Sequence, residues 1–299
     1  MSAAFPLWRS MLFVPAHVEK FVARAHQRGA DACILDLEDS VPMAQKAAAR
    51  SALPSAAGLV SQSGAAVLVR LNQSWELLGE DLEAAALPGI AALVLPKVND
   101  AAFVQEVAAR LDRLEAARGL EAGKIRLIAQ IEDVHALPRL DSIAASSTRL
   151  LGMILGSEDF SASAGMEPVP EALLWPNQQI VFACRRAGIL PLGFPGSIAE
   201  FADLEGFRRT IRLARQLGFV GAFCIHPDQV AILNEEFMPT PQAIAEARGV
   251  LAAYEAALQG GQGAAAYQGK MIDPPVVLRA QEVLRRAGAV AQAGKSGTP

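Results

Sequence analysis

Eight short apolar segments, each followed by a helical pattern, constrain the fold of this chain more than any other feature. Their last residues fall at positions 15, 39, 72, 97, 132, 159, 194 and 227, so successive segments end 24 to 35 residues apart. One strand, its covering helix and their connections take roughly 30 residues. The predicted strands are Ser10–Pro15, Ala32–Asp39, Ala66–Asn72, Ala92–Lys97, Arg126–Glu132, Leu151–Asp159, Ile189–Phe194 and Gly221–Pro227.

The segments between these strands have helical periodicity. In Ala101–Ala117, for example, Phe103, Val107 and Leu111 share one face, while charged residues lie off it. Nearly continuous apolar strands alternating with helices indicate parallel strands that are covered on both faces. Eight such units predict an α/β fold, a closed (β/α)₈ TIM barrel, rather than an open sheet.

The pattern changes near residue 238, so we predict a barrel domain over residues 1–237 and a C-terminal extension over 238–299. A Pro-Thr-Pro sequence breaks the barrel pattern, and glycines form a hinge between two further helices. The extension is either a lid or an oligomer contact. Its predicted parts are a helix over Ala243–Leu258, a hinge over Gly260–Gly263, a hairpin over Ala264–Asp273, a helix over Val276–Ala293 and a disordered tail over Gly294–Pro299.

Composition excludes several classes of protein. Hydrophobic residues make up 52% of the 299 residues and the net charge is −4, which predicts a large core and argues against nucleic acid or an anionic membrane as the main ligand. Without a signal peptide or a membrane-length apolar run, the chain is expected to be cytoplasmic. Cys33, Cys184 and Cys224 form no C-x-x-C pair and are expected to be buried, reduced thiols.

Polar residues end most of the predicted strands. In TIM barrels the active site lies at the C-terminal ends of the strands, so these residues are expected on one rim. Acids outnumber bases there, and their mutual repulsion requires either protonation or a cation. The rim residues are Glu38, Asp39, Arg70, Asn72, Lys97, Glu132, Asp133, Glu158, Asp159 and His226.

Glu132 and Asp159 end neighbouring strands and are the predicted metal ligands. Carboxylate oxygens without cysteine or clustered histidine suit Mg²⁺ or Mn²⁺ better than zinc. The alternative is that some of the rim acids cap the following helices. For Glu38, Asp39 and Asp133, structural roles and direct roles remain equally open.

Two of the basic rim residues, Arg70 and Lys97, each allow two interpretations. Arg70 is either a fixed fork for a substrate carboxylate or enolate oxygen, or one half of a structural bridge to Glu38 or Asp39. Lys97 lies beside so many carboxylates that its pKa should be raised, which disfavours a Schiff base and favours an electrostatic or structural role. His226 precedes a proline and is expected to be a hydrogen-bonded rim residue.

Seven motifs in order resemble the citrate lyase β-subunit-like proteins of the HpcH/HpaI aldolase superfamily, which include malyl-CoA and citramalyl-CoA lyases. The resemblance runs from residue 9 to about residue 285. The matching segments are Arg9–Pro15, Leu35–Val41, Val69–Asn72, Leu95–Val98, Gly156–Phe160, Ile225–Val230 and Gly269–Asp273.

The resemblance implies a function for several residues. The metal ligands of such lyases match Glu132 and Asp159, and the arginine that binds substrate oxygens and stabilises the enolate matches Arg70. An aspartate matching Asp273 reaches the active site of a neighbouring subunit for acid–base work, commonly in a homotrimer. Arg9 and Lys20 match part of the coenzyme A cradle.

We therefore predict a Mg²⁺-dependent carbon–carbon lyase that cleaves a β-hydroxyacyl-CoA reversibly, with Arg70, Asp273, Glu38 and Asp39 as catalytic candidates. Arg70 and Lys97 are also candidates for binding the substrate. Three alternatives are an acyl-CoA thioesterase, a citrate lyase β subunit acting on an acyl-carrier thioester, and a non-catalytic scaffold. A scaffold has no need of Glu132, Asp159, Arg70 and Asp273 together.

Three segments depart from the family pattern near the expected ligand site. Ala16 replaces a glycine, Gly193–Gly196 replaces an aspartate–glycine run with a small insertion after it, and Asp133-Val134 replaces a small polar residue and alanine. The metal site and the fold are therefore better specified than the substrate.

Overall fold

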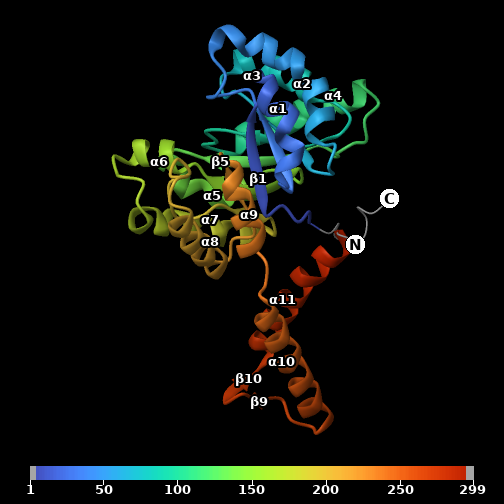
Figure 1. The fold of residues 1–299 in the computed structure, drawn as a ribbon, viewed down its shortest axis with the longest axis vertical. Helices are drawn as coiled ribbons and strands as arrows, with labels where there is room; N and C mark the ends of the chain where they lie inside the picture. Colours follow the sequence, from blue (N-terminus) through green and yellow to red (C-terminus); the bar gives the residue numbers. More distant parts are fainter. Residues whose placement is uncertain (1–4, 294–299) are drawn as a thin grey trace. The chain divides into compact units, whose positions relative to one another are not determined.

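The computed structural model describes residues 5–293 and contains the predicted (β/α)₈ barrel (Figure 1). All neighbouring barrel strands are parallel, in the order β7-β6-β5-β4-β3-β2-β1-β8. The strands are β1 Ser10–Pro15, β2 Ala32–Asp36, β3 Ala66–Arg70, β4 Ile90–Leu95, β5 Arg126–Ile131, β6 Leu150–Leu155, β7 Leu190–Leu192 and β8 Ala222–Cys224.

The barrel closes between its shortest strands, β7 and β8. Gly193 N donates to Gly221 O at 2.9 Å and Val220 N donates to Pro191 O at 3.1 Å. Gly221 is required here because a Cβ atom at this position would lie 1.8 Å from the Trp8 carbonyl oxygen.

Helices follow the strands and cover the outside of the barrel. Helix α4 coincides with the predicted segment and begins at an Asp100 cap, whose carboxylate accepts from Phe103 N at 2.9 Å. The helices are α1 Glu19–Ala25, α2 Lys46–Val60, α3 Trp75–Ala85, α4 Ala101–Ala117, α5 Leu140–Ala144, α6 Ser157–Ala164, α7 Pro170–Ala187, α8 Leu204–Leu217 and α9 Pro227–Glu236. The short 3₁₀ turns are η1 His26–Arg28, η2 Met43–Gln45 and η3 Val134–Arg139.

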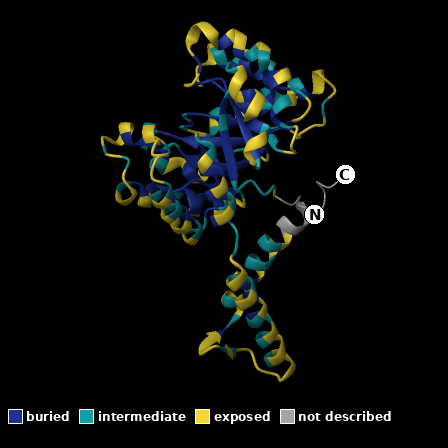
Figure 2. Ribbon diagram, viewed as in Figure 1, coloured by how far each residue is buried: buried dark blue, intermediate teal, exposed yellow. Residues whose placement is uncertain are grey.

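Alternation along the strands divides the core into two layers. Ile34 belongs to an inner cluster that fills the barrel, whereas its neighbours Cys33 and Leu35 belong to the cluster between strands and helices. Both faces of the strands are therefore apolar, and Figure 2 shows the strands as the buried part of this unit. Cys33, Cys184 and Cys224 are free and buried, as expected.

Several strands are shorter at their C-terminal ends than predicted. Strand β2 stops at Asp36 instead of Asp39, β5 at Ile131 instead of Glu132, and β6 at Leu155 instead of Asp159. The polar residues that were assigned to the ends of these strands, such as Glu38, Glu132 and Asp159, lie in the connections that follow the strands.

The chain divides into two compact units between Phe237 and Met238. The second unit contains α10 Pro241–Gln259, the antiparallel pair β9 Ala265–Tyr267 and β10 Lys270–Ile272, and α11 Pro274–Ala293. The hairpin turns at Gln268-Gly269, whose φ angles of 50° and 76° suit a two-residue turn. The predicted tail Gly294–Pro299 lies outside the described residues. Within the described part of the chain, no helix is both long and apolar enough to cross a membrane.

Candidate active site

A pocket lies at the C-terminal ends of the barrel strands and has two kinds of wall. Its polar lining includes Asp36, Arg70, Gln130, Glu132 and Asp159, which come from β2, β3, β5 and the segments that follow β5 and β6. Its apolar lining comprises Phe13, Ile154, Leu155, Phe194, Ile198, Phe223 and Ile225. The parallel strands thus bring five of the predicted rim residues to one cavity, namely Asp39, Arg70, Glu132, Glu158 and Asp159. The pocket lining does not include Glu38, Asn72, Lys97, Asp133 or His226.

Arg70 is the fixed cation of this pocket. Its Nε and Nη2 donate to the two Asp36 oxygens at 2.7 and 2.8 Å, and its Nη1 lies 2.8 Å from Glu38 Oε2. The guanidinium also stacks 4.7 Å from the centre of the Phe13 ring. Asp39 Oδ2 is 3.7 Å from Nη1 and its side chain is largely exposed, so Asp36 and Glu38 hold the arginine.

Asp36 stays ionised in this arrangement. It is buried, and burial alone would raise its pKa, but the hydrogen bonds and charge of Arg70 lower that pKa below its usual value. The Ser40 hydroxyl and the Glu38 main-chain N–H donate to the same carboxylate. Asp36 is therefore the permanent counter-ion of Arg70.

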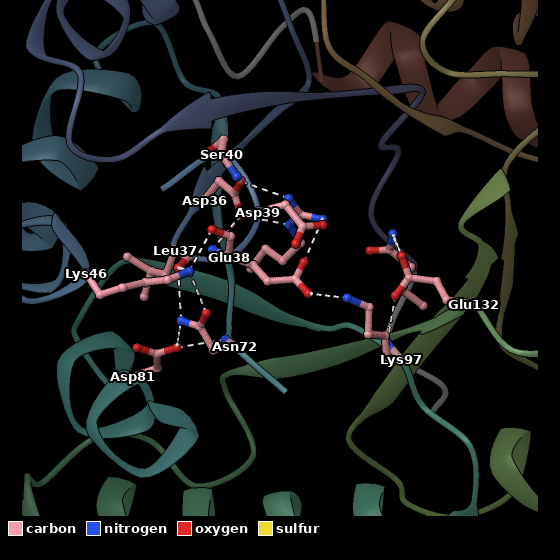
Figure 3. Close-up of polar contacts among 12 residues, drawn as sticks. Asp36, Leu37, Glu38, Asp39, Ser40, Lys46, Asn72, Asp81, Lys97 and Glu132 are labelled. Atoms are coloured by element: carbon pink, nitrogen blue, oxygen red, sulfur yellow. Dashed lines mark hydrogen bonds and ion pairs between the residues drawn. The ribbon is translucent and has the colours of Figure 1, made fainter. Parts of the chain in front are cut away.

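Glu38 is a buried carboxyl between two cations. It is 5% exposed; Arg70 Nη1 lies 2.8 Å from its Oε2, and Lys97 Nζ lies 3.4 Å from its Oε1. Figure 3 shows the contact with Lys97. Burial and the charges of Asp39 and Asp36 raise the pKa of Glu38 to about 7, although Arg70 and Lys97 oppose the shift. Glu38 is thus poised to exchange a proton near neutral pH.

Glu132 is held by two neutral donors. Lys97 N donates to Oε2 at 2.7 Å and Gln130 Nε2 donates to Oε1 at 2.8 Å, while the side chain is buried. Gly156 leaves room for it, since a Cβ at residue 156 would lie 2.5 Å from Glu132 Cγ. Burial, followed by the charge of Glu38, raises the pKa of Glu132 to about 8.

Asp159 lines the same pocket as Glu132 and is half-buried in the first turn of α6. The two carboxylates follow adjacent strands, and the Asp159 charge contributes to the raised pKa of Glu132. With its pKa raised to about 8, Glu132 holds a proton near neutral pH, and its two neutral hydrogen-bond donors would not balance its charge once it ionises. The chemistry of this donor pair fits a hard divalent cation whose other ligands are water and substrate oxygens. No cluster of three or more histidine, cysteine or acidic side chains suited to a metal occurs among the residues that the structure describes.

A buried network supports the segment that carries Glu38. Lys46 Nζ donates to Leu37 O, Glu38 O and Asn72 Oδ1, each at 2.7 Å (Figure 3). Asn72 Nδ2 donates in turn to Leu37 O at 2.9 Å and to Asp81 Oδ2 at 2.7 Å. Lys46 and Asn72 therefore fix the main chain on which Glu38 lies.

Lys97 and His226 have the surroundings that the sequence predicts. Burial alone would lower the pKa of Lys97, but neighbouring carboxylates, chiefly Glu38, raise it, which agrees with an electrostatic rather than a Schiff-base role. His226 caps α9, and its Nδ1 accepts from Asp228 N at 3.3 Å. Asp133 likewise caps η3 by accepting from His135 N.

Arg9 does not reach the pocket, and its predicted place in the coenzyme A cradle does not agree with its position. It precedes β1, whose C-terminal end lines the pocket, so Arg9 lies at the opposite end of the barrel. There it forms an ion pair with Asp31 at 2.7 Å and donates to Asn234 O at 3.1 Å. Arg9 thus forms a structural clamp at the base of the barrel, whereas Phe13 and Pro15 of the same motif line the pocket.

Lys20 lies in a groove beside the pocket. The groove is lined by Lys20, Phe21, Arg24, Arg28 and His226, and it shares Phe13, Pro15 and Ile225 with the pocket. Asp273 belongs to the second unit, where Val276 N bonds to its main-chain oxygen at the start of α11.

Four residues of the site were not singled out by the sequence analysis: Asp36, Lys46, Gln130 and Gly156. Asp36 is the only acid of β2, but its role becomes visible only through its register with Arg70 in the structure. Gln130 and Gly156 flank the predicted ligands without a charge of their own, and Lys46 lies in the next helix.

Comparisons with known proteins agree with this geometry. Residues 9–227 match the model of the family described as HpcH/HpaI aldolase/citrate lyase. The chain is 35% identical to citrate lyase subunit beta of Leuconostoc mesenteroides subsp. cremoris, with 95% of this chain and 94% of the relative covered. It is 36% identical to L-malyl-CoA/beta-methylmalyl-CoA lyase of Cereibacter sphaeroides, with 91% of both chains covered.

A solved structure extends the likeness to three dimensions. Mycobacterium tuberculosis CitE, in complex with magnesium, acetoacetate and coenzyme A, matches with a TM-score of 0.76 and 32% identity over 96% of this chain and 100% of that one. The match spans nearly all of both chains, and the family model spans the barrel with its rim. The chain belongs to the HpcH/HpaI aldolase/citrate lyase family.

Proposed function

We propose that this protein is a Mg²⁺-dependent lyase that reversibly cleaves the carbon–carbon bond of a β-hydroxyacyl-CoA such as malyl-CoA or citramalyl-CoA. The observation that carries the proposal is the pairing, in one pocket, of a clamped Arg70 with the two carboxylates Glu132 and Asp159. Relatives named as lyases and a CitE structure that holds magnesium and coenzyme A support it.

Glu132 and Asp159 would hold the cation, Mg²⁺ or Mn²⁺, from adjacent strands. When bound, the cation supplies Lewis-acid polarisation of the keto-acid carbonyl. Gln130 Nε2 and Lys97 N orient Glu132 so that its carboxylate faces the pocket.

Arg70 would stabilise the negative charge that develops on the thioester oxygen when the carbon–carbon bond breaks. Its fork is locked by Asp36, so it does not have to reorganise as that charge appears. In the cleavage direction the hydroxyl group loses a proton and the released acyl-CoA carbon gains one. Glu38, whose pKa is about 7, and Asp273, delivered by a neighbouring subunit, are the proposed exchangers. Asp39 would add negative charge at the rim.

The groove next to the pocket would bind coenzyme A. Lys20, Arg24 and Arg28 are cations suited to phosphate groups, and Phe21, which is 51% exposed, offers a ring for the adenine base. The groove and the pocket share Phe13 and Pro15, so a thioester lying in the groove can reach Arg70.

We further propose a homo-oligomer, a trimer by analogy with the family, in which the second unit supplies Asp273 in trans. Mixing Asp273→Asn and Arg70→Gln variants tests this arrangement. Mixed oligomers of two inactive variants should regain part of the activity, because some sites then combine an intact Arg70 with an intact Asp273. If subunit exchange is demonstrated and the mixture still has no activity, delivery of Asp273 in trans is ruled out.

The central test is a reaction with Mg²⁺, glyoxylate or pyruvate, and acetyl-CoA or propionyl-CoA. A new hydroxyacyl-CoA without release of free thiol identifies a lyase. Release of free thiol identifies a thioesterase instead, and activity only with an acyl-carrier thioester identifies a citrate lyase subunit. Asp159→Ala should lose metal-dependent turnover while it keeps its fold, and full activity of that variant would remove Asp159 from the site.

A further inference from the structure

Lys97 lies in a break at the end of β4. Leu95 is in register with Ala129 of β5, and the next main-chain bond to β5 runs from Val98 N to Gln130 O at 3.0 Å. A regular continuation of the ladder would bring Lys97 N, not Val98 N, to Gln130 O, so the chain contains one extra residue here. Lys97 therefore lies outside the ladder, where its N–H is free to point elsewhere.

The backbone of Lys97 is strained. Its φ of 51° falls in the left-handed region, which a non-glycine residue enters at a cost. In the described part of the chain only Gln268 shares this feature among non-glycine residues, and Gln268 occupies a hairpin turn that demands a positive φ. Lys97 is in no hairpin, so its conformation needs another reason.

Two contacts provide that reason. The main-chain N–H of Lys97 donates to Glu132 Oε2 at 2.7 Å, and its ammonium lies 3.4 Å from Glu38 Oε1. Figure 3 shows Lys97 between the two acids. Glycine would offer the same N–H without strain, so only the contact with Glu38 makes use of the lysine side chain.

We infer that Lys97 is a positioning residue that ties Glu38 and Glu132 together, with its main chain fixing one carboxylate and its ammonium fixing the other. The inference deepens the proposed function and depends on it. It predicts that the two contacts can be separated by mutation, since the N–H survives any substitution except proline.

The experiment compares Lys97→Gly with Lys97→Ala. Both keep the N–H and lose the ammonium, so both should lower kcat by about 10- to 100-fold with little change in the Mg²⁺ affinity measured by calorimetry. Glycine relieves the strain and alanine keeps it. Lys97→Gly should therefore unfold about 2–4 °C above Lys97→Ala.

Equal loss of kcat in two variants of different stability separates positioning from a purely structural role, in which the more stable Lys97→Gly would also be more active than Lys97→Ala. Lys97→Arg should recover part of kcat, and Lys124→Ala, at an exposed lysine paired with Glu121, serves as the control. Wild-type kcat in Lys97→Gly would overturn the inference, as would loss of Mg²⁺ binding in Lys97→Gly. Failure of the proposed function would appear separately, as absence of lyase activity in the wild-type protein.

Discussion

Asp36 and Arg70 stand in register on neighbouring parallel strands, and two hydrogen bonds of 2.7 and 2.8 Å join the carboxylate to the guanidinium. Both residues are at least nine-tenths buried. One edge of the guanidinium, Nε and Nη2, is thus used by Asp36, and Nη1 is paired with Glu38 at 2.8 Å. Its orientation is set before any ligand arrives.

Asp36→Asn should remove the ionic part of this clamp while preserving its shape. Removing one charge of a buried pair leaves the other uncompensated, at a cost of about 3–5 kcal/mol in the free energy of unfolding. Urea denaturation measures that loss, and turnover should fall with it. Unchanged stability and turnover would mean that Arg70 is held by Glu38 alone.

Gly156→Ala should displace Glu132, because the new Cβ would lie 2.5 Å from Glu132 Cγ. We expect Mg²⁺ affinity, measured by calorimetry, to fall about tenfold or more. The matched control is Gly79→Ala in α3, where a Cβ meets nothing within 4 Å and should stabilise the helix by about 0.5–1 kcal/mol. Normal Mg²⁺ binding in Gly156→Ala would remove Glu132 from the metal site.

The protein without Mg²⁺ should lose stability as the pH rises. Burial raises the pKa of Glu132 to about 8 and that of Glu38 to about 7, both above the ordinary value of 4.5. The folded state therefore holds these protons more tightly than the unfolded state. Their contribution is complete below about pH 4.5 and is lost as the pH rises through the folded pKa values.

Thermal unfolding between about pH 5 and pH 8.5, with and without Mg²⁺, measures this effect. Mg²⁺ should reduce the fall because it replaces the proton as partner of Glu132. Glu132→Gln should flatten the Mg²⁺-free profile. A wild-type profile that is no steeper than that of Glu132→Gln would show that Glu132 does not titrate in this range.

Lys46→Met should destabilise the segment that carries Glu38. The variant removes the ammonium that bonds to Leu37 O, Glu38 O and Asn72 Oδ1, and a broken buried polar network costs about 3 kcal/mol or more. We expect lower stability and lower kcat together, by urea denaturation and turnover. Lys124→Met, at an exposed position, should change neither. A stable, fully active Lys46→Met would show that the loop holds its shape without the lysine.

The double variant Lys20→Ala/Arg24→Ala should raise the KM for the CoA thioester and leave kcat nearly unchanged, because these side chains line the groove rather than the pocket. Weaker dependence of KM on salt should accompany the change. An unchanged KM, with the same salt dependence as the wild type, would place the coenzyme elsewhere.

The barrel and its rim can be predicted from the chain because both depend on local pattern. Apolar runs at intervals of one strand–helix unit specify the strands, and polar residues that end such runs must meet at one rim. Glu132, Asp159 and Arg70 were found in this way. The pattern does not reveal where a strand leaves the ladder, so the ends of β2, β5 and β6 were wrong.

The remaining differences come from contacts that link distant parts of the sequence. Asp36 looks like part of an apolar strand until its register with Arg70 is known, and Lys46 reaches Glu38 only after α2 has packed. Arg9 shows the opposite error. Its motif implied a ligand site, but its position before β1 places it at the base of the barrel, bound to Asp31.

The joint between β7 and β8 is secured by few amides, because each of these strands has three residues. We expect local opening of the barrel to begin between these two strands. The amides of Val220 and Gly193 should therefore exchange with deuterium earlier than amides of β3 or β5. Phe194 and Phe223 flank this joint and also line the pocket. We expect the pocket to accommodate bulky acyl groups on this side, because few main-chain hydrogen bonds hold this part of its wall.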